Sequence, residues 1–437
     1  MAAAHAAVQP QIWAKLWRSK ACTVGTGEGI ILLGRIFRCL SVLLMLAFAT
    51  VDVVAQAEPV PAHQNSMVIA LPEPTGTEGI GVVDLHLVDA SRHDPYIPDR
   101  LRELMISIWY PAIDVAGVPV RSWLAPDLAR MYAEGLIHYG IPMAVPWILA
   151  PSHGHVDAPA DVAGGGRPVM LFSPGLSMPR ELSTAQAEDL ASHGFIVVTS
   201  SYTYETFATQ FPDGRIEKSV LPPATDRDQT KAQVASALPI RVADTRFVLD
   251  KLADIAAGDN PDADRHPLPD NLARILDVSK VAMFGHSLGG TTAAQSMHDD
   301  RRILAGANLD GVLSGSVVID GLDRPFMLVG AENHGRDNDP TWQQFRANDH
   351  GPKLDFRLDG AQHLSFCDNQ LIVPPLAAAG ITSSENAAQL VGTIDPRDSL
   401  DLQRGYLRTF FDTTLGRYDD LPQAPVTLLH PEMVPVP

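Results

Sequence analysis

A ten-residue stretch at residues 281–290, VAMFGHSLGG, decides the fold. Residues 280–284 are typical of a short buried strand, and the small residues of 289–297 are typical of a helix. Between them lies the pattern G-x-S-x-G, with Ser287 at its centre. Side chains beside the serine would collide in so tight a turn, so glycines flank it, and the hydroxyl is pushed clear of the backbone at the start of the next helix. The bare pattern is weak, but this context predicts that Ser287 is a nucleophile and not part of a structural turn.

Strand-like and helical segments alternate on both sides of this turn. Expected strands cover residues 168–173, 195–200, 280–284, 304–309, 326–331 and 354–358, and expected helices cover 180–193, 240–255, 289–297 and 400–415. Buried strands that alternate with helices indicate a mostly parallel sheet with helices on both faces. Two earlier segments, 81–88 and 104–110, are close in sequence and should form antiparallel edge strands. The pattern predicts the α/β class and, with the serine turn, the α/β-hydrolase fold.

Two regions interrupt the alternation. Residues 121–166 are apolar but broken by prolines, and residues 202–239 are polar and loop-like. Both are expected to be insertions near the substrate end of the sheet, where functional loops gather. We therefore expect a catalytic domain at 75–420, with a Pro-rich linker at 58–74 before it and a Pro-rich tail at 421–437 after it.

The N-terminus has the features of an export signal. Arg35 and Arg38 precede an apolar run at 40–49, and an Ala-Gln-Ala site ends at Ala57. A membrane anchor is the alternative, but the run is shorter than the roughly 20 residues that span a bilayer. The sequence predicts a signal peptide at 1–57, cleavage after Ala57, and a secreted or periplasmic protein.

Charge and cysteine content exclude several classes of partner and of covalent cross-link. The formal net charge is −18, and the 33 Lys and Arg residues form no cluster. Phosphate binding needs a cationic footprint, so the charge argues against nucleic acid as a partner and against electrostatic docking on anionic lipid. Cleavage after Ala57 would bring the net charge to −21 and leave Cys367 as the remaining cysteine, so no intrachain disulfide is expected. No spacing matches a known metal site, and no cofactor is expected.

A serine hydroxyl is a poor nucleophile at neutral pH and needs an adjacent base. In this fold the triad follows the order serine, acid, histidine, with the histidine after the last strand. His363 fits that place, 76 residues after Ser287, in the segment DGAQH. The other downstream histidines, His298, His334, His350 and His430, fit it less well.

The residues leave the triad acid open. The usual place for it follows the strand at 326–331, where Glu332, Asp337 and Asp339 lie. The rival is Asp310, which ends the preceding strand and could equally be a turn former.

The oxyanion hole of such an enzyme is built from backbone N–H groups. One comes from the residue after the nucleophile, here Leu288, and one from the loop after the first central parallel strand, here Leu176. Leu176 lies in the segment FSPGLS at 172–177, where Gly175 would let the backbone approach a substrate.

The chain resembles the secreted-type platelet-activating-factor acetylhydrolases and their bacterial relatives over about residues 104–415. The resemblance is carried by FSPGL at 172–176, DLASHGFIV at 189–197, the turn at 285–290, Leu309-Asp310 and GAQH at 360–363. It implies that Asp310 is the acid, that Leu176 and Leu288 supply the oxyanion donors, and that the activity is hydrolysis of a carboxylic ester. The implied substrates include short sn-2 acyl chains of phospholipids.

The resemblance has two departures. Pro174 stands where that family commonly has histidine, and the helices with which its members contact lipid surfaces are matched only loosely, at 124–149.

Two other functions compete with this one. Cutinase-like polyester hydrolases are similar at the serine turn and carry a catalytic aspartate in a Gly-x-Glu-Asn-Asp segment. Here that segment, residues 330–334, reads GAENH, so His334 takes the place of the acid. This favours Asp310 and weakens the polyesterase interpretation. A non-catalytic member of the fold that binds a lipid or a partner is also disfavoured, because all three triad residue types are present in order.

Overall fold

The computed structural model describes residues 67–142, 147–416 and 431–436. The predicted signal peptide at 1–57 and its cleavage site lie outside the described residues, as do residues 58–66 of the predicted linker and 417–430 before and within the predicted tail.

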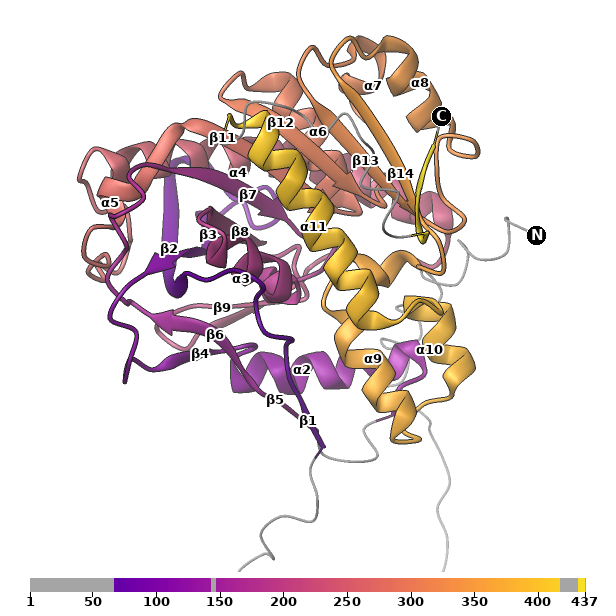
Figure 1. Cartoon of the computed structure of the whole chain (residues 1–437), viewed down its shortest axis with the longest axis horizontal. Coiled ribbons are helices and arrows are strands. Elements are labelled where there is room, and N and C mark those ends of the chain that lie inside the picture. Colours follow the sequence, from indigo (N-terminus) through magenta and orange to yellow (C-terminus); the bar gives the residue numbers. More distant parts are fainter. Residues whose placement is uncertain (1–66, 143–146, 417–430, 437) are drawn as a thin grey trace, which may run out of the picture.

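A large mixed sheet forms the centre of the molecule (Figure 1). In the described residues it has eleven strands, in the order β15-β14-β13-β12-β11-β7-β8-β3-β2-β6-β4. Six neighbouring strands, from β8 to β14, run parallel. These are β7 (Arg167–Ser173), β8 (Ile196–Tyr202), β11 (Leu276–His286), β12 (Ile303–Leu309), β13 (Phe326–Ala331) and β14 (Lys353–Leu358). The predicted α/β class and mostly parallel sheet are confirmed.

The antiparallel N-terminal strands do not form the edge of the sheet. β2 (Gly79–His93) and β3 (Leu101–Ala112) pair antiparallel as predicted. Beyond β2, however, lie β6 (Pro151–Val156) and β4 (Val120–Ser122), both from the region expected to be an insertion. The sequence PSHGHV of β6 has no apolar run to reveal a strand. At the opposite edge, β15 (Met433–Pro435) in the predicted tail pairs antiparallel with β14.

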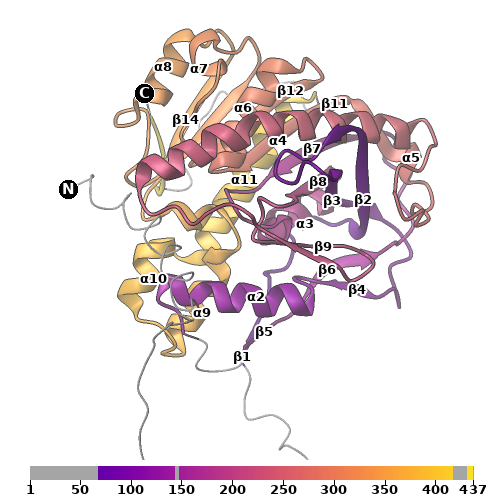
Figure 2. The ribbon, with the colours of Figure 1, turned by 180° about the vertical axis from the view of Figure 1, so that it is seen from behind.

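Helices cover both faces of the sheet, as Figures 1 and 2 show from opposite sides. One face carries α3 (Thr184–Ser192) and α11 (Pro396–Thr414). The other carries α4 (Arg227–Ala256), α5 (Leu272–Ile275), α6 (Leu288–Asp299), α7 (Val317–Asp320) and α8 (Pro340–Asn348). Along β11, Ala282 and Phe284 pack into one apolar cluster and Val281 and Met283 into the other. This alternation is the two-residue period of a strand that is buried on both faces.

The prediction that residues 202–239 are loop-like is wrong for residues 227–239. Helix α4 begins at Arg227, where the Asp226 carboxylate caps it by accepting the N–H of Gln229 at 2.8 Å. Pro239 lies inside this helix. Proline removes one helical hydrogen bond, and the expected helix began after this residue, at 240. The first half of the region holds a hairpin of β9 (Ala208–Gln210) and β10 (Ile216–Lys218).

A separate apolar cluster lies beside the segment that follows β14. It joins α2 (Pro126–Leu136) to α9 (Asn369–Ala378) and α10 (Ser384–Val391), which the sequence analysis did not predict. The short parallel pair of β1 (Met67–Ile69) and β5 (Trp147–Leu149) packs against the same cluster. Among the described helices, none is both long and apolar enough to cross a membrane.

Candidate active site

Ser287 lies in a strained turn between β11 and α6. Its φ of 58° and ψ of −123° are unusual for a residue with a side chain, and such a conformation costs about 1–3 kcal/mol. The flanking glycines are required by contact. A Cβ atom added to Gly289 would lie 1.8 Å from the carbonyl oxygen of Ser173, and one added to Gly285 would lie 2.3 Å from the carbonyl carbon of Gly289. These distances confirm that side chains at the two glycine positions would collide with the backbone, as the sequence pattern predicted.

Ser287 and Asp310 leave the sheet at the same level. His286 on β11 is paired with Leu309 on β12, so the next residue of each strand lies at the carboxyl edge of the sheet. The Ser287 N–H donates to the Leu309 carbonyl at 2.8 Å, and the Asp310 N–H donates to the Val329 carbonyl at 2.7 Å. Parallel pairing thus brings together two residues that are 23 positions apart in sequence.

The Asp310 carboxylate is bonded to His363. The distance from Asp310 Oδ2 to His363 Nδ1 is 2.5 Å. The other oxygen, Oδ1, accepts the Ala331 N–H at 2.8 Å and faces His334 Nδ1 at 2.7 Å. Burial alone would raise the pKa of Asp310, but the two imidazoles and these hydrogen bonds outweigh it and hold the pKa well below its usual range. Asp310 is therefore a carboxylate.

The alternative acids do not meet His363. Glu332 and Asp337 are exposed, and neither contacts His363. Asp339 is buried but binds His334, with 2.8 Å between its Oδ2 and His334 Nε2. Of the four acids that the sequence left open, the structure brings only Asp310 to His363.

His334 is a residue of this site to which the sequence analysis gave no role. Its two ring nitrogens face the carboxylates of Asp310 and Asp339. An ionised carboxylate only accepts hydrogen bonds, so both nitrogens carry protons and the ring is an imidazolium. Burial lowers the pKa of His334, but the two carboxylates outweigh it and raise the pKa to about 10. The sequence signal that could have pointed to His334 was its position three residues after β13, in the region where the fold usually places the acid.

His286 holds the backbone of His363 beside the turn. Its Nε2–H donates to the carbonyl oxygen of His363 at 2.9 Å, and the two ring centroids are 4.7 Å apart. Burial and the neighbouring His363 lower the pKa of His286 to about 3, so the ring is neutral. The residue next to the serine thereby fixes the segment that carries the histidine.

The two predicted oxyanion donors belong to segments next to Ser287. Leu288 is the first residue of α6. Leu176 is in the loop after β7, which passes so close that a Cβ atom added to Gly175 would lie 3.5 Å from Ser287 Cβ. Within the described residues, neither the Leu176 nor the Leu288 N–H donates a hydrogen bond. Both groups are free to bind a substrate oxygen.

The described residues contain no group of three or more His, Cys, Asp or Glu side chains arranged to hold a metal ion. The serine turn, the parallel sheet and the helices on both faces define an α/β-hydrolase, the fold class predicted from the sequence.

Comparison with known proteins gives the family. Residues 71–424 match the model of the family described as platelet-activating factor acetylhydrolase, isoform II. The chain belongs to this family and is an ester hydrolase, which confirms the resemblance drawn from the sequence motifs.

Individual relatives agree with the family. A protein of Arthroderma benhamiae named "Probable 1-alkyl-2-acetylglycerophosphocholine esterase" is 30% identical over 83% of this chain and 93% of its own length. The platelet-activating factor acetylhydrolase of Canis lupus familiaris is 25% identical over 67% of this chain and 69% of its own length. A solved ferulic acid esterase from Streptomyces cinnamoneus has a TM-score of 0.68 and 30% identity, covering 84% of this chain and 99% of that one.

Proposed function

We propose that this protein hydrolyses carboxylic esters through an acyl-enzyme on Ser287. Ser287 attacks the ester carbonyl while His363 takes its proton, and His363 then gives that proton to the leaving alcohol. Asp310 holds the imidazole in the required tautomer and stabilises its charged form. The N–H groups of Leu176 and Leu288 stabilise the oxyanion of each tetrahedral intermediate. Water then attacks the acyl-enzyme, with His363 again as the base.

One observation carries this proposal: the bond between Asp310 and His363 beside the strained turn of Ser287. A carboxylate that is buried and bonded to Nδ1 leaves Nε2 as the imidazole nitrogen available to a nucleophile. The strand register independently supports the pairing, because it puts Ser287 and Asp310 at the ends of adjacent strands.

For the substrate we propose a short acyl ester, with the sn-2 acetyl group of a glycerophospholipid as the first candidate. The name of the Arthroderma relative supports this choice. A small non-lipid carboxylic ester is the second candidate, and the likeness to the ferulic acid esterase favours it. Turnover of p-nitrophenyl esters of increasing acyl length, followed by 1-alkyl-2-acetylglycerophosphocholine and methyl ferulate, distinguishes the two.

Labelling with a fluorophosphonate probe tests the nucleophile. The purified protein should be labelled at Ser287, and the Ser287→Ala variant should not be labelled. Ser279→Ala, at an exposed serine on β11, the strand that precedes Ser287, serves as the control and should react like the wild type. If the folded wild-type protein is not labelled, it is a non-catalytic member of the fold and the proposed function fails.

Amide substitutions test the acid. Asp310→Asn should lower kcat about 10⁴-fold, because an amide favours the wrong imidazole tautomer. Glu332→Gln and Asp337→Asn should keep wild-type turnover, since both side chains are exposed. Normal turnover in Asp310→Asn would overturn this assignment.

Export is proposed on the sequence of residues 1–57 alone. Expression in a host with a general secretory pathway should release a mature chain that begins at Glu58, and N-terminal sequencing of that product is the test. A secreted or cell-associated protein that retains residues 1–57 would contradict the proposal.

A further inference from the structure

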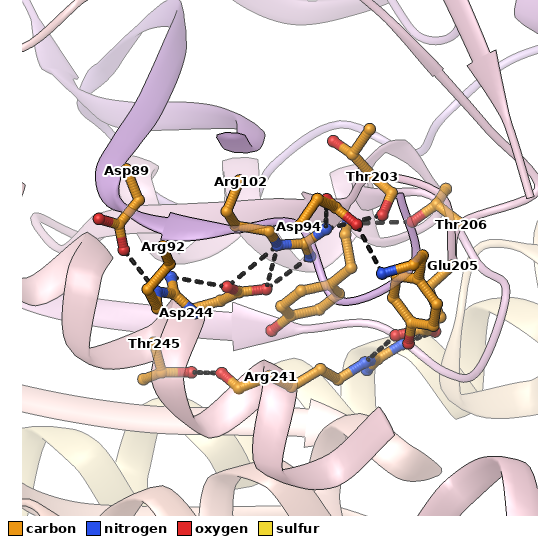
Figure 3. A network of polar contacts seen from close by, with 12 residues as sticks. Asp89, Arg92, Asp94, Arg102, Thr203, Glu205, Thr206, Arg241, Asp244 and Thr245 are labelled. Atoms are coloured by element: carbon orange, nitrogen blue, oxygen red, sulfur yellow. Dashed lines mark hydrogen bonds and ion pairs between the residues drawn. The ribbon is translucent and has the colours of Figure 1, made fainter. Parts of the chain in front are cut away.

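Arg241, on α4, bonds to Glu205 (Figure 3) and also reaches the loop that carries Leu176. Its side chain is fully buried, with 0% exposed. Nη1 donates to the Pro174 carbonyl at 2.5 Å and to Ser173 Oγ at 3.2 Å. Nη2 donates to the Gly175 carbonyl at 3.0 Å. Arg241 thus holds the backbone on the N-terminal side of Leu176.

Glu205 completes the arrangement from the loop after β8. It takes the remaining two donors of Arg241, with Nε at 2.7 Å and Nη2 at 2.5 Å, so all five guanidinium N–H groups have partners. The same Glu205 carboxylate accepts the N–H of Ser177 at 3.2 Å. Leu176 is therefore held on both sides by one ion pair, while its own N–H stays free.

Such an ion pair is costly to bury. Removing two charges from water costs several kcal/mol per ion, which their attraction repays only if the geometry is good and every remaining polar atom is bonded. Here the guanidinium also packs on the Tyr202 ring, 4.2 Å from its centroid, and the Tyr202 hydroxyl is 2.9 Å from Ser173 Oγ. A rigid, fully bonded fork is suited to fixing backbone carbonyls in one orientation, which a flexible lysine cannot do.

The protein contains a matched ion pair that lacks this connection. Arg102 on β3 is also 0% exposed and binds Asp94 and Asp244, the latter on the same helix as Arg241 (Figure 3). Its other partner is the Thr203 carbonyl, and it makes no hydrogen bond to residues 173–177. The two arginines differ chiefly in whether they touch the loop.

We propose that Arg241 and Glu205 are positioning residues that set the Leu176 N–H in place to receive the oxyanion. The proposal rests on the proposed function and adds two residues that act through Leu176 without touching the substrate. A preorganised donor acts mainly in the transition state, where charge develops on the substrate oxygen, so loosening the loop should lower kcat far more than it raises KM.

The test compares Arg241→Lys with Arg102→Lys. Both variants lose a buried guanidinium group and its hydrogen bonds, so the melting temperature of both should fall. Only Arg241→Lys should lose turnover, with kcat down about 10- to 100-fold and KM changed less than about 3-fold, a smaller loss than removal of a whole oxyanion donor. Arg102→Lys should keep kcat within about 3-fold of the wild type.

A trifluoromethyl ketone provides a second readout at the site itself. The Ser287 oxygen bonds to the ketone carbon, its proton passes to His363, and the carbonyl oxygen becomes an oxyanion facing the Leu176 and Leu288 N–H groups. Affinity for this adduct should fall in Arg241→Lys by the same factor as kcat. Affinity in Arg102→Lys should not fall.

A second variant covers the case in which Arg241→Lys does not fold. Glu205→Gln keeps the size of the side chain and removes its charge, and it should lower kcat and ketone affinity in parallel. Unchanged kcat and ketone affinity in the folded Arg241 or Glu205 variant overturns the proposal, as does an equal loss in Arg102→Lys. A wild-type protein inert to esters, ketone and fluorophosphonate would instead overturn the proposed function.

Discussion

Replacing His334 with asparagine should show how much the charge of this residue beside the active site contributes to stability. The asparagine amide would keep a donor near the position of His334 Nδ1, and so could still bond Asp310 Oδ1, but it would lose the charge and the bond to Asp339. A rise in pKa from 6.5 to about 10, at about 1.4 kcal/mol for each tenfold change in proton affinity, sets an upper limit of about 5 kcal/mol. Loss of one charge-assisted hydrogen bond alone costs about 1.5–3 kcal/mol. We therefore expect His334→Asn to lower the free energy of unfolding by about 2–4 kcal/mol at pH 7.

The direction of the pH dependence of stability follows from the raised pKa. The pKa of His334 is higher in the folded state than its ordinary 6.5, so its contribution is complete below pH 6.5 and is lost as pH rises through about 10. Urea unfolding of wild type and variant at pH 7 and pH 10.5 measures the difference. The difference in unfolding free energy between the two proteins should be large at pH 7 and much smaller at pH 10.5.

His298 offers a matched control for this measurement. It too lies between two aspartates, Asp299 at 2.7 Å and Asp320 at 3.2 Å, but both carboxylates are more exposed than those around His334. His298→Asn should cost less than about 1 kcal/mol, as is usual for surface pairs. The reasoning about His334 is refuted if its variant loses the same stability at both pH values, because the loss would then be one of packing.

Three further predictions concern the turn and its surroundings. Gly289→Ala should abolish turnover and destabilise the protein by several kcal/mol, measured by activity and thermal unfolding, because its Cβ would lie 1.8 Å from the Ser173 carbonyl oxygen; a stable, active variant would contradict the steric argument. Phe284→Ala should cost about 3–5 kcal/mol in urea unfolding, since Phe284 is fully buried and packs edge-on to Phe172 with ring centroids 5.0 Å apart; a cost below about 1 kcal/mol would contradict it. Burial raises the pKa of Cys367 to about 12, so iodoacetamide at pH 8 should leave Cys367 unmodified in the native protein and alkylate it in urea, as peptide mass spectrometry would report; rapid alkylation of the native protein would show that the thiol is reachable.

The sequence was most informative where a requirement is local. The glycines around Ser287 are needed because of contacts within the turn and with the neighbouring strand β7, and the alternation of apolar strands and helices follows from burial on both faces. These features predicted the fold class correctly. They also placed His363 after the last strand of the parallel set, where the structure has it.

The identity of the proposed triad acid could not be predicted from local sequence patterns. Four carboxylates fit the spacing, and only likeness to known families favoured Asp310 before the structure was considered. What separates them is burial and pairing: Asp310 is buried and bonded to His363, whereas Glu332 and Asp337 face solvent. Hydrogen bonds between residues 53 positions apart leave no periodic trace in the chain.

Secondary structure without apolar periodicity was missed for a related reason. β6 joins the sheet through backbone hydrogen bonds to β2, and its residues carry no strand pattern. The part of α4 that precedes Pro239 was also missed, and its first residues are fixed by the Asp226 cap.

The sequence by itself determined the main features of the proposed active site: a serine in a glycine-flanked turn, a histidine after the last parallel strand, and the sheet that positions both. Only the tertiary structure decided which acid faces that histidine, that His334 bridges two carboxylates, and that Arg241 reaches 67 residues back to the loop of Leu176. The physical reason is that turns and strands are specified by neighbouring residues, whereas the electrostatics of a buried site depend on which charges the fold brings within hydrogen-bonding distance.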